Sequence, residues 1–438
     1  MRQLITPIAM ILTFAFSAAL VLHASAAPPN VVFILADDLG WMDLGCYGTS
    51  FYESPSLDRL AAEGMKFTRA YTAGSVCSPT RSSIVTSQYP ARNGCTNYGG
   101  SVKGTEHGLA KALGEGGYET FFVGKWHIGR LSPQASGFQS VGNVTTSKGE
   151  DPKGTRSITR SAVEFISKKH GRPFFAYVCY HAVHTPLLED KATVAKYRAR
   201  AAKLEPPGEP LLGKEHDRGM KLRQDTPEFA AMVEVMDRGV GEILEAIRQS
   251  GVERNTLVIF FSDNGGLSTR AFGGVYPTSN LPLRAGKGWL YEGGIRVPLI
   301  VRLPGVVEPG SVCDMPITST DFYPTLLELA ELPLRPKDHA DGQSVAGLLR
   351  GEEGSARDIL YWHYPHQHGA GCPPSGAVRV GDWKLIEYFS DGTVELYNTA
   401  DDIGEKNNLA AKLPEKRDAL LEKLKAYQNS IPDIRFGK

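Results

Sequence analysis

The sequence lacks an excess of charge of either sign, since Lys plus Arg and Asp plus Glu each number 48 among its 438 residues. A balanced chain has no general attraction for nucleic acid, so nucleic acid is not an expected partner and any anion selectivity must be local. Internal repeats are also lacking, and no segment beyond residue 22 is long and apolar enough to span a bilayer. We therefore expect no stable membrane insertion.

The first residues have the composition of an export signal. Arg2 supplies a positive start, residues 4–22 are mostly apolar, and residues 24–26 (ASA) match an A-x-A cleavage pattern. An uncleaved membrane anchor is the alternative, which Pro7 and the small residues at the end of the stretch disfavour. The sequence therefore predicts a signal peptide over 1–26 and a secreted or periplasmic mature protein.

Cysteine is scarce, and its use is ambiguous. The six residues are Cys46, Cys77, Cys95, Cys179, Cys313 and Cys372. An even number in an exported protein could form disulfide bonds in several pairings. Cys179 lies within the apolar run PFFAYVCY, where a buried free thiol is expected.

Short apolar runs alternate with helical patterns along the chain. The runs typical of strands buried on both faces are VVFILAD (31–37), YETFFVG (118–124), PFFAYVCY (173–180) and TLVIFFSD (256–263). Between the last two, apolar residues from Phe229 to Ile247 repeat at helical spacing, and Gly251 follows them. This alternation predicts an α/β fold with a doubly wound, mostly parallel sheet.

The pattern changes after about Gly351. Residues 377–389 and 393–398 are typical of antiparallel strands, and residues 415–428 of a final helix. We therefore expect a large α/β domain over 28–352 and a small C-terminal α+β domain with an antiparallel sheet over 353–438. Residues 204–224 and 364–376 are rich in Pro, Gly, His or charge, and are predicted to be loops.

Two acidic pairs follow predicted strands directly. Asp37 and Asp38 follow the first strand, and Asp263 and Asn264 follow the last. Ligands of open α/β sheets gather at the carboxyl ends of strands, so the two pairs could meet there. Three clustered carboxylates would repel one another, and an all-oxygen ligand set suits a hard cation such as Ca²⁺ or Mg²⁺. Either pair alone would more often be a turn or a helix cap.

Cys77 precedes a predicted helix. Pro79 suits the first helical position, which would place Cys77 just before a helix N-terminus, with Arg81 one turn further on. A thiol there would have a lowered pKa. Thiolate catalysis, half of a disulfide, and a plain buried cysteine all remain open on this reasoning.

Six motifs in order resemble those of the sulfatases of the alkaline phosphatase superfamily. They are ILADDLG (34–40), CSPTR (77–81), GYETFFVGKWH (117–127), HTP (184–186), SDNGG (262–266) and GKG (286–288). The resemblance runs from about Asn30 to about Leu409. One departure is Thr86-Ser87-Gln88, where the family usually has Thr-Gly-Arg.

The resemblance implies an arylsulfatase-like enzyme in which a maturation enzyme oxidises Cys77 to formylglycine. The hydrated aldehyde attacks sulfur through one hydroxyl, and the second hydroxyl allows sulfate to leave. By the same resemblance, calcium is bound by Asp37, Asp38, Asp263, Asn264 and the modified Cys77.

The remaining roles implied by the resemblance belong to basic residues. Arg81 and Lys125 fix the aldehyde hydrate and the developing charge, and Lys287 contacts the sulfate. His127 is the base, and His184 is the acid that protonates the leaving oxygen. Taken singly, each histidine would more often be structural, and His181 is a possible neighbour of His184.

The substrate is less well defined. Export favours a sulfate ester on a carbohydrate, with an aryl sulfate as the small-molecule equivalent. The segment YWHYPHQHGAGCPP (361–374) is rich in aromatic and imidazole groups, so it either covers the mouth of the site and sets specificity or packs between the two domains. The alternatives in function are a phosphonate or phosphodiester hydrolase of the same superfamily and a silent sulfated-glycan-binding protein.

Overall fold

One large sheet forms the centre of the fold. The computed structural model describes residues 27–103, 108–205, 211–270, 274–352 and 357–431. Within these residues the strand order is β10-β2-β9-β8-β1-β5-β3-β4, with β11 beside β2. The strands are β1 (Asn30–Ala36), β2 (Met65–Tyr71), β3 (Glu119–Gly124), β4 (Ser140–Val141), β5 (Phe174–Cys179), β8 (Thr256–Ser262), β9 (Arg296–Arg302), β10 (Ser311–Cys313) and β11 (Ile317–Thr318).

The middle of the sheet is parallel. Strands β8, β1, β5 and β3 are parallel neighbours, whereas β9 runs antiparallel to both β8 and β2. The four apolar runs of the sequence are these four parallel strands, so the predicted doubly wound, mostly parallel sheet is confirmed. Strands β2 and β9 were not predicted, although β9 is an apolar run that is buried throughout.

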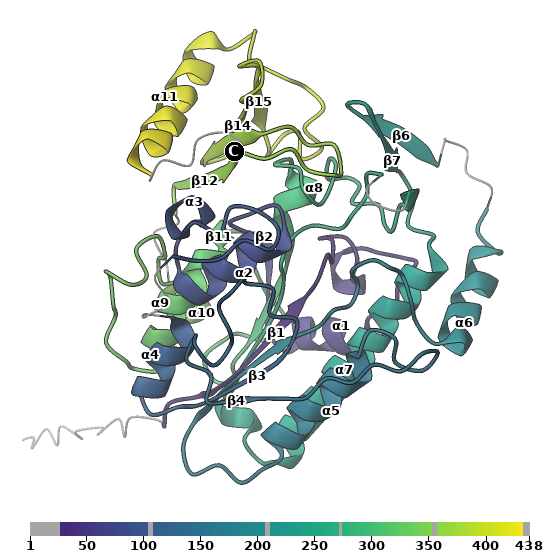
Figure 1. Ribbon diagram of the computed structural model, residues 1–438, viewed down its shortest axis with the longest axis vertical. Coiled ribbons are helices and arrows are strands. Elements are labelled where there is room, and N and C mark those ends of the chain that lie inside the picture. Colours follow the sequence, from purple (N-terminus) through teal and green to yellow (C-terminus); the bar gives the residue numbers. More distant parts are fainter. Residues whose placement is uncertain (1–26, 104–107, 206–210, 271–273, 353–356, 432–438) are drawn as a thin grey trace, which may run out of the picture.

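Helices cover both faces of the sheet, which is why its central strands are apolar throughout. In β1, Val31, Phe33 and Leu35 join one buried cluster, while Val32 and Ile34 join the cluster on the other face. Helices α1 (Pro55–Ala62), α5 (Thr155–Ile166) and α7 (Pro227–Gln249) cover one face, with α6 (Lys191–Ala201) outside them; α2 (Cys77–Thr86), α4 (Leu109–Glu115) and α9 (Phe322–Leu329) cover the other (Figure 1). Shorter helices are α3 (Pro90–Asn93), α8 (Glu292–Ile295) and α10 (Ala346–Leu349), and 3-10 turns span Gly45–Tyr47, Glu253–Asn255 and Ser319–Asp321.

The predicted loop over 204–224 is partly wrong, because it contains an antiparallel hairpin. Strands β6 (Leu212–Glu215) and β7 (Arg218–Lys221) pair with each other and stand apart from the large sheet. A tertiary contact holds the hairpin, since the buried Glu215 carboxylate forms an ion pair with Arg284 at 2.8 Å. That contact has no signature in a short, highly charged stretch of sequence.

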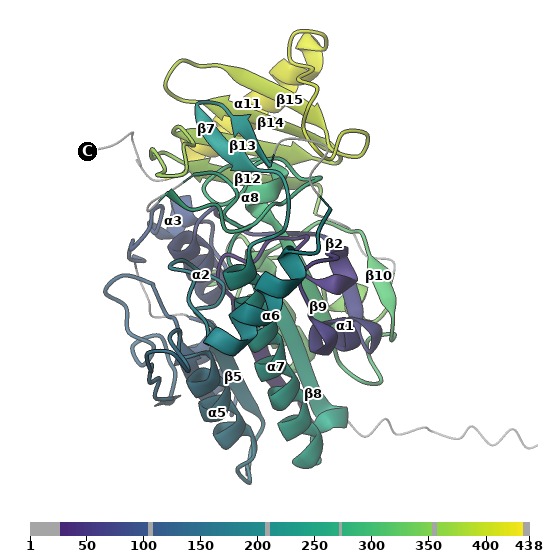
Figure 2. The ribbon, with the colours of Figure 1, turned by 90° about the vertical axis from the view of Figure 1, so that its right-hand side faces the viewer.

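A four-stranded antiparallel sheet and a helix form the C-terminal part, as predicted. The elements are β12 (Ile359–Tyr364), β13 (Ser375–Val380), β14 (Trp383–Tyr388), β15 (Val394–Asn398) and α11 (Pro414–Ser430). This layer lies beyond the end of the large sheet that bears α2 and α8 (Figure 2). Tyr71, Trp289 and Trp362 belong to one buried cluster that joins the two parts. The proposed boundary at 352/353 stays a prediction.

A buried ion triad also joins the two parts. Lys384 on β14 contacts Glu292 of α8 at 2.9 Å and Glu405 at 2.7 Å, and all three side chains are fully buried.

The structure also bears on the cysteines and the N-terminus. All six cysteines lie in described residues and are free thiols, and Cys179 is buried as expected. The predicted signal peptide, residues 1–26, lies outside the described residues. No described helix combines the length and the apolar character needed to cross a membrane.

Candidate active site

The carboxyl ends of four adjacent parallel strands carry most of the predicted site. Asp37 and Asp38 follow β1, Lys125 and His127 follow β3, His184 follows β5, and Asp263 and Asn264 follow β8. Because β8, β1, β5 and β3 are neighbours, these residues meet at one edge of the sheet. Helix α2 adds Cys77 and Arg81, and Lys287 comes from the segment before α8. The structure thus brings together the residues that the sequence singled out.

Cys77 is the first residue of α2, with Val76 as the N-cap, so the prediction that the helix begins at Pro79 is wrong by two residues. Proline is tolerated at the third position because the first four N–H groups of a helix have no intrahelical partner. The Sγ atom is 3.5 Å from Asp37 Oδ1 and 3.5 Å from Lys287 Nζ. Burial raises the pKa of this thiol to about 12, although Lys125 and Lys287 act to lower it. The expected lowered pKa is therefore wrong, because desolvation outweighs the helix terminus and the cations.

Three basic side chains of the site, Lys125, Lys287 and Arg81, form close ion pairs with carboxylates. Lys125 Nζ is 2.6 Å from Asp37, and Lys287 Nζ is 2.7 Å from Asp38. Arg81 donates through Nε to Asp263 at 2.8 Å, and through a second nitrogen to the Lys125 carbonyl. These ion pairs hold the strand ends and α2 in fixed positions. The side chains of Lys125, Lys287 and Arg81 are therefore oriented before any substrate binds.

The three carboxylates differ in electrostatics. Burial acts to raise the pKa of Asp37, but the charges of Lys125, His184 and Arg81 outweigh it and hold that pKa well below its usual value. The pKa of Asp263 is instead raised to about 7 by burial and by the nearby charge of Asp37. Ionisation of Asp263 beside the other two carboxylates is therefore unfavourable unless a further positive charge is bound nearby.

The carboxylates and the Asn264 amide oxygen suit a hard divalent cation, whereas the thiol of Cys77 and the imidazole of His184 beside them are softer donors. Asp37, Asp38, Cys77 and His184 each offer one ligand atom within a group spanning at most 4.8 Å. Asn264 Nδ2 donates to Asp38 at 2.9 Å, and the buried Asn264 Oδ1 has no hydrogen-bond partner in the part of the chain that the structure describes. A buried amide oxygen with no donor is costly, and a cation coordinated by oxygens would satisfy it.

The two predicted catalytic histidines are in different environments. His184 Nδ1 contacts the Thr185 carbonyl, so Nδ1 carries the proton and Nε2 faces Asp38 at 3.8 Å. His127 packs edge-on against Tyr98, with ring centroids 4.5 Å apart. Burial and the charge of Lys125 lower the pKa of His127 to about 4, so this imidazole is neutral at neutral pH.

Backbone strain accompanies two of these side chains. Asp38 has φ of 63° and His127 has φ of 59°, both in the left-handed region that non-glycine residues rarely adopt. Such conformations are maintained only when the surrounding structure fixes them, and they concentrate at functional sites.

A cavity of about 400 Å³ opens over this edge of the sheet. It is lined by Asp37, Tyr98, Gly124, Lys125, Trp126, His127, Lys153, His181, His184 and Thr185. His181, flagged as a neighbour of His184, does lie beside it. Tyr98, Trp126 and Lys153 were not predicted. Trp126 lies inside the GKWH motif, which could have drawn attention to it, whereas Tyr98 and Lys153 stand in polar segments with no motif.

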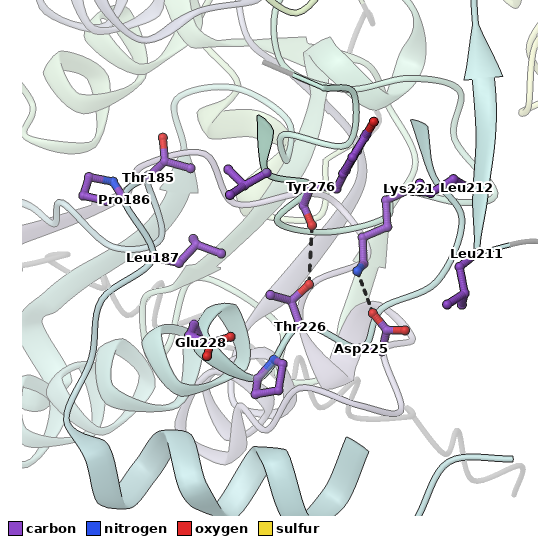
Figure 3. A pocket seen from close by; sticks show the side chains of 12 residues that line it. Thr185, Pro186, Leu187, Leu211, Leu212, Lys221, Asp225, Thr226, Glu228 and Tyr276 are labelled. Carbon is purple, nitrogen blue, oxygen red and sulfur yellow. Dashed lines mark hydrogen bonds and ion pairs between the residues drawn. The ribbon is translucent and has the colours of Figure 1, made fainter. Parts of the chain in front are cut away.

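A second, mostly apolar cavity of about 1060 Å³ adjoins the first, since Thr185 lines both. Figure 3 shows residues of its walls. Pro186 and Leu187 follow His184 in the sequence, Leu211 and Leu212 lie at the start of the hairpin β6–β7, and Tyr276 lies between these two groups in the view. Lys221 and Asp225 form an ion pair of 2.6 Å on one wall.

The aromatic segment 361–374 packs between the two sheets and also contacts a loop beside the smaller cavity. Trp362 and Tyr364 are buried in the cluster that joins the two sheets, as the packing interpretation expects. His366 Nε2 lies 3.0 Å from Thr96 Oγ1, and Tyr364 donates to Asn97 at 3.2 Å. These contacts support the loop that carries Tyr98 into the smaller cavity. A role in specificity stays a prediction.

Comparisons with known proteins agree with this geometry. The sulfatase family model matches residues 29–332, and a model described as N-sulphoglucosamine sulphohydrolase, C-terminal, matches residues 285–430. A protein named sulfatase from Formosa agariphila is 33% identical, with 94% of this chain and 91% of that protein covered. The chain belongs to the sulfatase family. Hydrolysis of a sulfate ester is therefore its class of activity.

Other relatives and solved structures extend the comparison. Human arylsulfatase A is 30% identical, with 86% of this chain and 78% of that protein covered. A crystal structure of Ps i-CgsB in complex with k-i-k-neocarrahexaose superposes with a TM-score of 0.77 at 26% identity, covering 94% of this chain and 95% of that one. The phosphonate monoester hydrolase of Agrobacterium radiobacter has a TM-score of 0.69 at 20% identity, covers 92% of this chain and 95% of that one, and shares the fold alone.

Proposed function

We propose that this sulfatase is exported and removes sulfate from a sulfated saccharide, with Cys77 matured to formylglycine and one bound Ca²⁺. The proposal is supported most by the position of Cys77, whose Sγ lies 3.5 Å from both Asp37 and Lys287 at the end of the parallel sheet. A side chain at this point can meet a sulfate ester that is held between Lys125 and Lys287.

Cys77 supplies the nucleophile once it is a formylglycine hydrate, whose two hydroxyls allow attack on sulfur and later release of sulfate. The cation would be held by Asp37, Asp38, Asp263, Asn264 and side chain 77, and would supply a positive charge for the sulfate oxygens. Lys125, Lys287 and Arg81 orient that group and stabilise negative charge as it develops.

The histidines move the protons. The neutral His127 accepts a proton from side chain 77 when sulfate is released, because its lowered pKa leaves it unprotonated at neutral pH. In its imidazolium form, His184 donates the Nε2 proton to the leaving oxygen, while its Nδ1–H stays hydrogen-bonded to the Thr185 carbonyl. Thr185 also opens onto the larger cavity, so we place the rest of the saccharide along Pro186, Leu187 and Tyr276.

The test is sulfate release from an aryl sulfate and from a panel of sulfated saccharides, with calcium and with chelator. We expect activity from the wild type and none above background from Cys77→Ala. A peptide containing position 77 should show the exchange of sulfur and two hydrogens for one oxygen. Full activity from a protein with an intact thiol there would contradict the mechanism, and hydrolysis of phosphonates alone would favour the alternative.

A further inference from the structure

Lys153 stands apart from the other basic residues of the site. It lines the smaller cavity beside His181 and His184, yet no ion pair or hydrogen bond joins its ammonium to any described residue. Lys125 and Lys287, in contrast, contact Asp37 and Asp38 at 2.6 and 2.7 Å. Lys153 is thus a cavity-lining cation whose partner is not supplied by the described protein.

The backbone around Lys153 is held in place. Asp151 accepts hydrogen bonds from the N–H groups of Arg156 at 3.1 Å and Ser157 at 2.9 Å, in the first turn of α5. Gly154, with φ of 68°, makes the turn between Lys153 and the helix. The ammonium is therefore presented from an anchored turn, which reduces the entropy lost when it binds a ligand.

Lys153 shares the smaller cavity with Lys125, His127 and His184, but it lies outside the buried group around side chain 77. The residues around side chain 77 (Cys77, Arg81, Asp263 and Lys287) are buried and do not line the cavity, whereas Lys153 is half-buried and does. The scissile sulfate belongs with the buried group, so Lys153 meets what is attached to it. Burial lowers the pKa of Lys153 to about 8, which leaves it mostly charged at neutral pH.

We propose that Lys153 determines specificity by binding a second anionic group, a carboxylate or another sulfate, on the sugar that carries the scissile ester. An ammonium is a compact point charge that suits either anion. This inference rests on the proposed saccharide sulfatase function and names the kind of substrate that the enzyme prefers.

The test compares Lys153→Met and Lys153→Arg with a matched control, Lys148→Met, which removes an exposed lysine from the same polar segment. The substrates are an aryl sulfate, a neutral monosulfated sugar, the same sugar with a second sulfate, and a monosulfated uronic acid. We expect K153M to lower kcat/KM about 10- to 100-fold on one or both doubly charged sugars, mainly through KM, as for a lost charge-assisted hydrogen bond. Activity on the two singly charged substrates should change less than about two-fold by the same reasoning.

The control variants and the choice of substrates distinguish a specific role of Lys153 from a general loss of activity. K153R should keep much of the preference, K148M should keep all of it, and the more affected sugar identifies carboxylate or sulfate as the anion. An equal loss on all four substrates, or a wild type without preference for double charge, would overturn the inference. In a Cys77→Ala background, K153M should weaken binding of the doubly sulfated sugar about ten-fold by calorimetry. That arm tests Lys153 even if no substrate is turned over, in which case the proposed function itself fails.

Discussion

At the scale of single residues, the proposed role of His184 as an acid through Nε2 gives a prediction that depends on the leaving group. His184→Ala removes the proton donor, so sugar sulfates, whose alcohols are poor leaving groups, should lose about 10²- to 10⁴-fold in kcat. A nitrophenyl sulfate needs little protonation and should lose far less. His127→Ala should slow both substrates alike. Steady-state kinetics on the two substrates checks this, and a uniform loss from H184A would contradict the acid role.

Asn264 carries a second prediction at this scale. Its buried Oδ1 has no hydrogen-bond partner among the described residues, and it is one of the proposed ligands of the cation. Asn264→Ala should therefore raise about ten-fold or more the calcium concentration needed to raise the melting temperature. Thermal unfolding across a calcium titration measures this without relying on activity. An unchanged calcium dependence would remove Asn264 from the ligand set.

At the scale of elements, the C-terminal end of α2 explains the departure at Ser87. Ser87 is the C-cap and has φ of 52°, a left-handed conformation in which glycine is unstrained. Its Oγ donates to the Thr320 carbonyl, a contact that glycine could not make. Ser87→Gly and Ser87→Ala both lose this hydrogen bond, but only alanine keeps the strain of the left-handed conformation. The glycine variant should therefore be more stable than the alanine variant by about 1 kcal/mol. Urea unfolding compares them, and equal stabilities would refute the strain.

The sequence predicted some elements and not others for physical reasons. Strands β1, β3, β5 and β8 were predictable because burial on both faces leaves continuous apolar runs. The hairpin β6–β7 was not, since it depends on the Glu215–Arg284 contact between distant segments. The site was predicted through motifs at strand ends, whereas Lys153 reaches the cavity only because a polar segment folds back before α5.

At the scale of the whole molecule, the buried triad of Lys384, Glu292 and Glu405 fixes the C-terminal sheet to the large one. Lys384→Met should destabilise the protein by about 3–5 kcal/mol, because it leaves the buried Glu405 without its cation and Glu292 with Arg296 alone. Adding Glu292→Gln and Glu405→Gln should recover part of that loss. Chemical denaturation measures both, and a K384M protein as stable as the wild type would show that the triad is not an anchor.

The same triad predicts a dependence on pH. Burial and the charge of Glu292 raise the pKa of Glu405 to about 7, against an ordinary value of 4.5, despite the opposing charge of Lys384. Because the folded state holds this proton more tightly, the contribution of Glu405 to stability is full below about pH 4.5 and is lost as pH rises towards 7. Glu405→Gln should therefore gain stability relative to the wild type between about pH 5 and 8. A constant difference over that range would contradict the shifted pKa.

The burial of α2 has a consequence for biogenesis. Side chain 77 has an exposed fraction of 0%, and Ser78, Thr80 and Arg81 of the same motif are exposed by 1% or less. An oxidising enzyme that has to bind residues 77–81 cannot reach them in the folded protein. If Cys77 is matured as proposed, the conversion to the aldehyde takes place before the sheet closes around this residue. A host that lacks the oxidising enzyme during translation would yield a well-folded but permanently inert protein, beyond repair by later treatment in vitro.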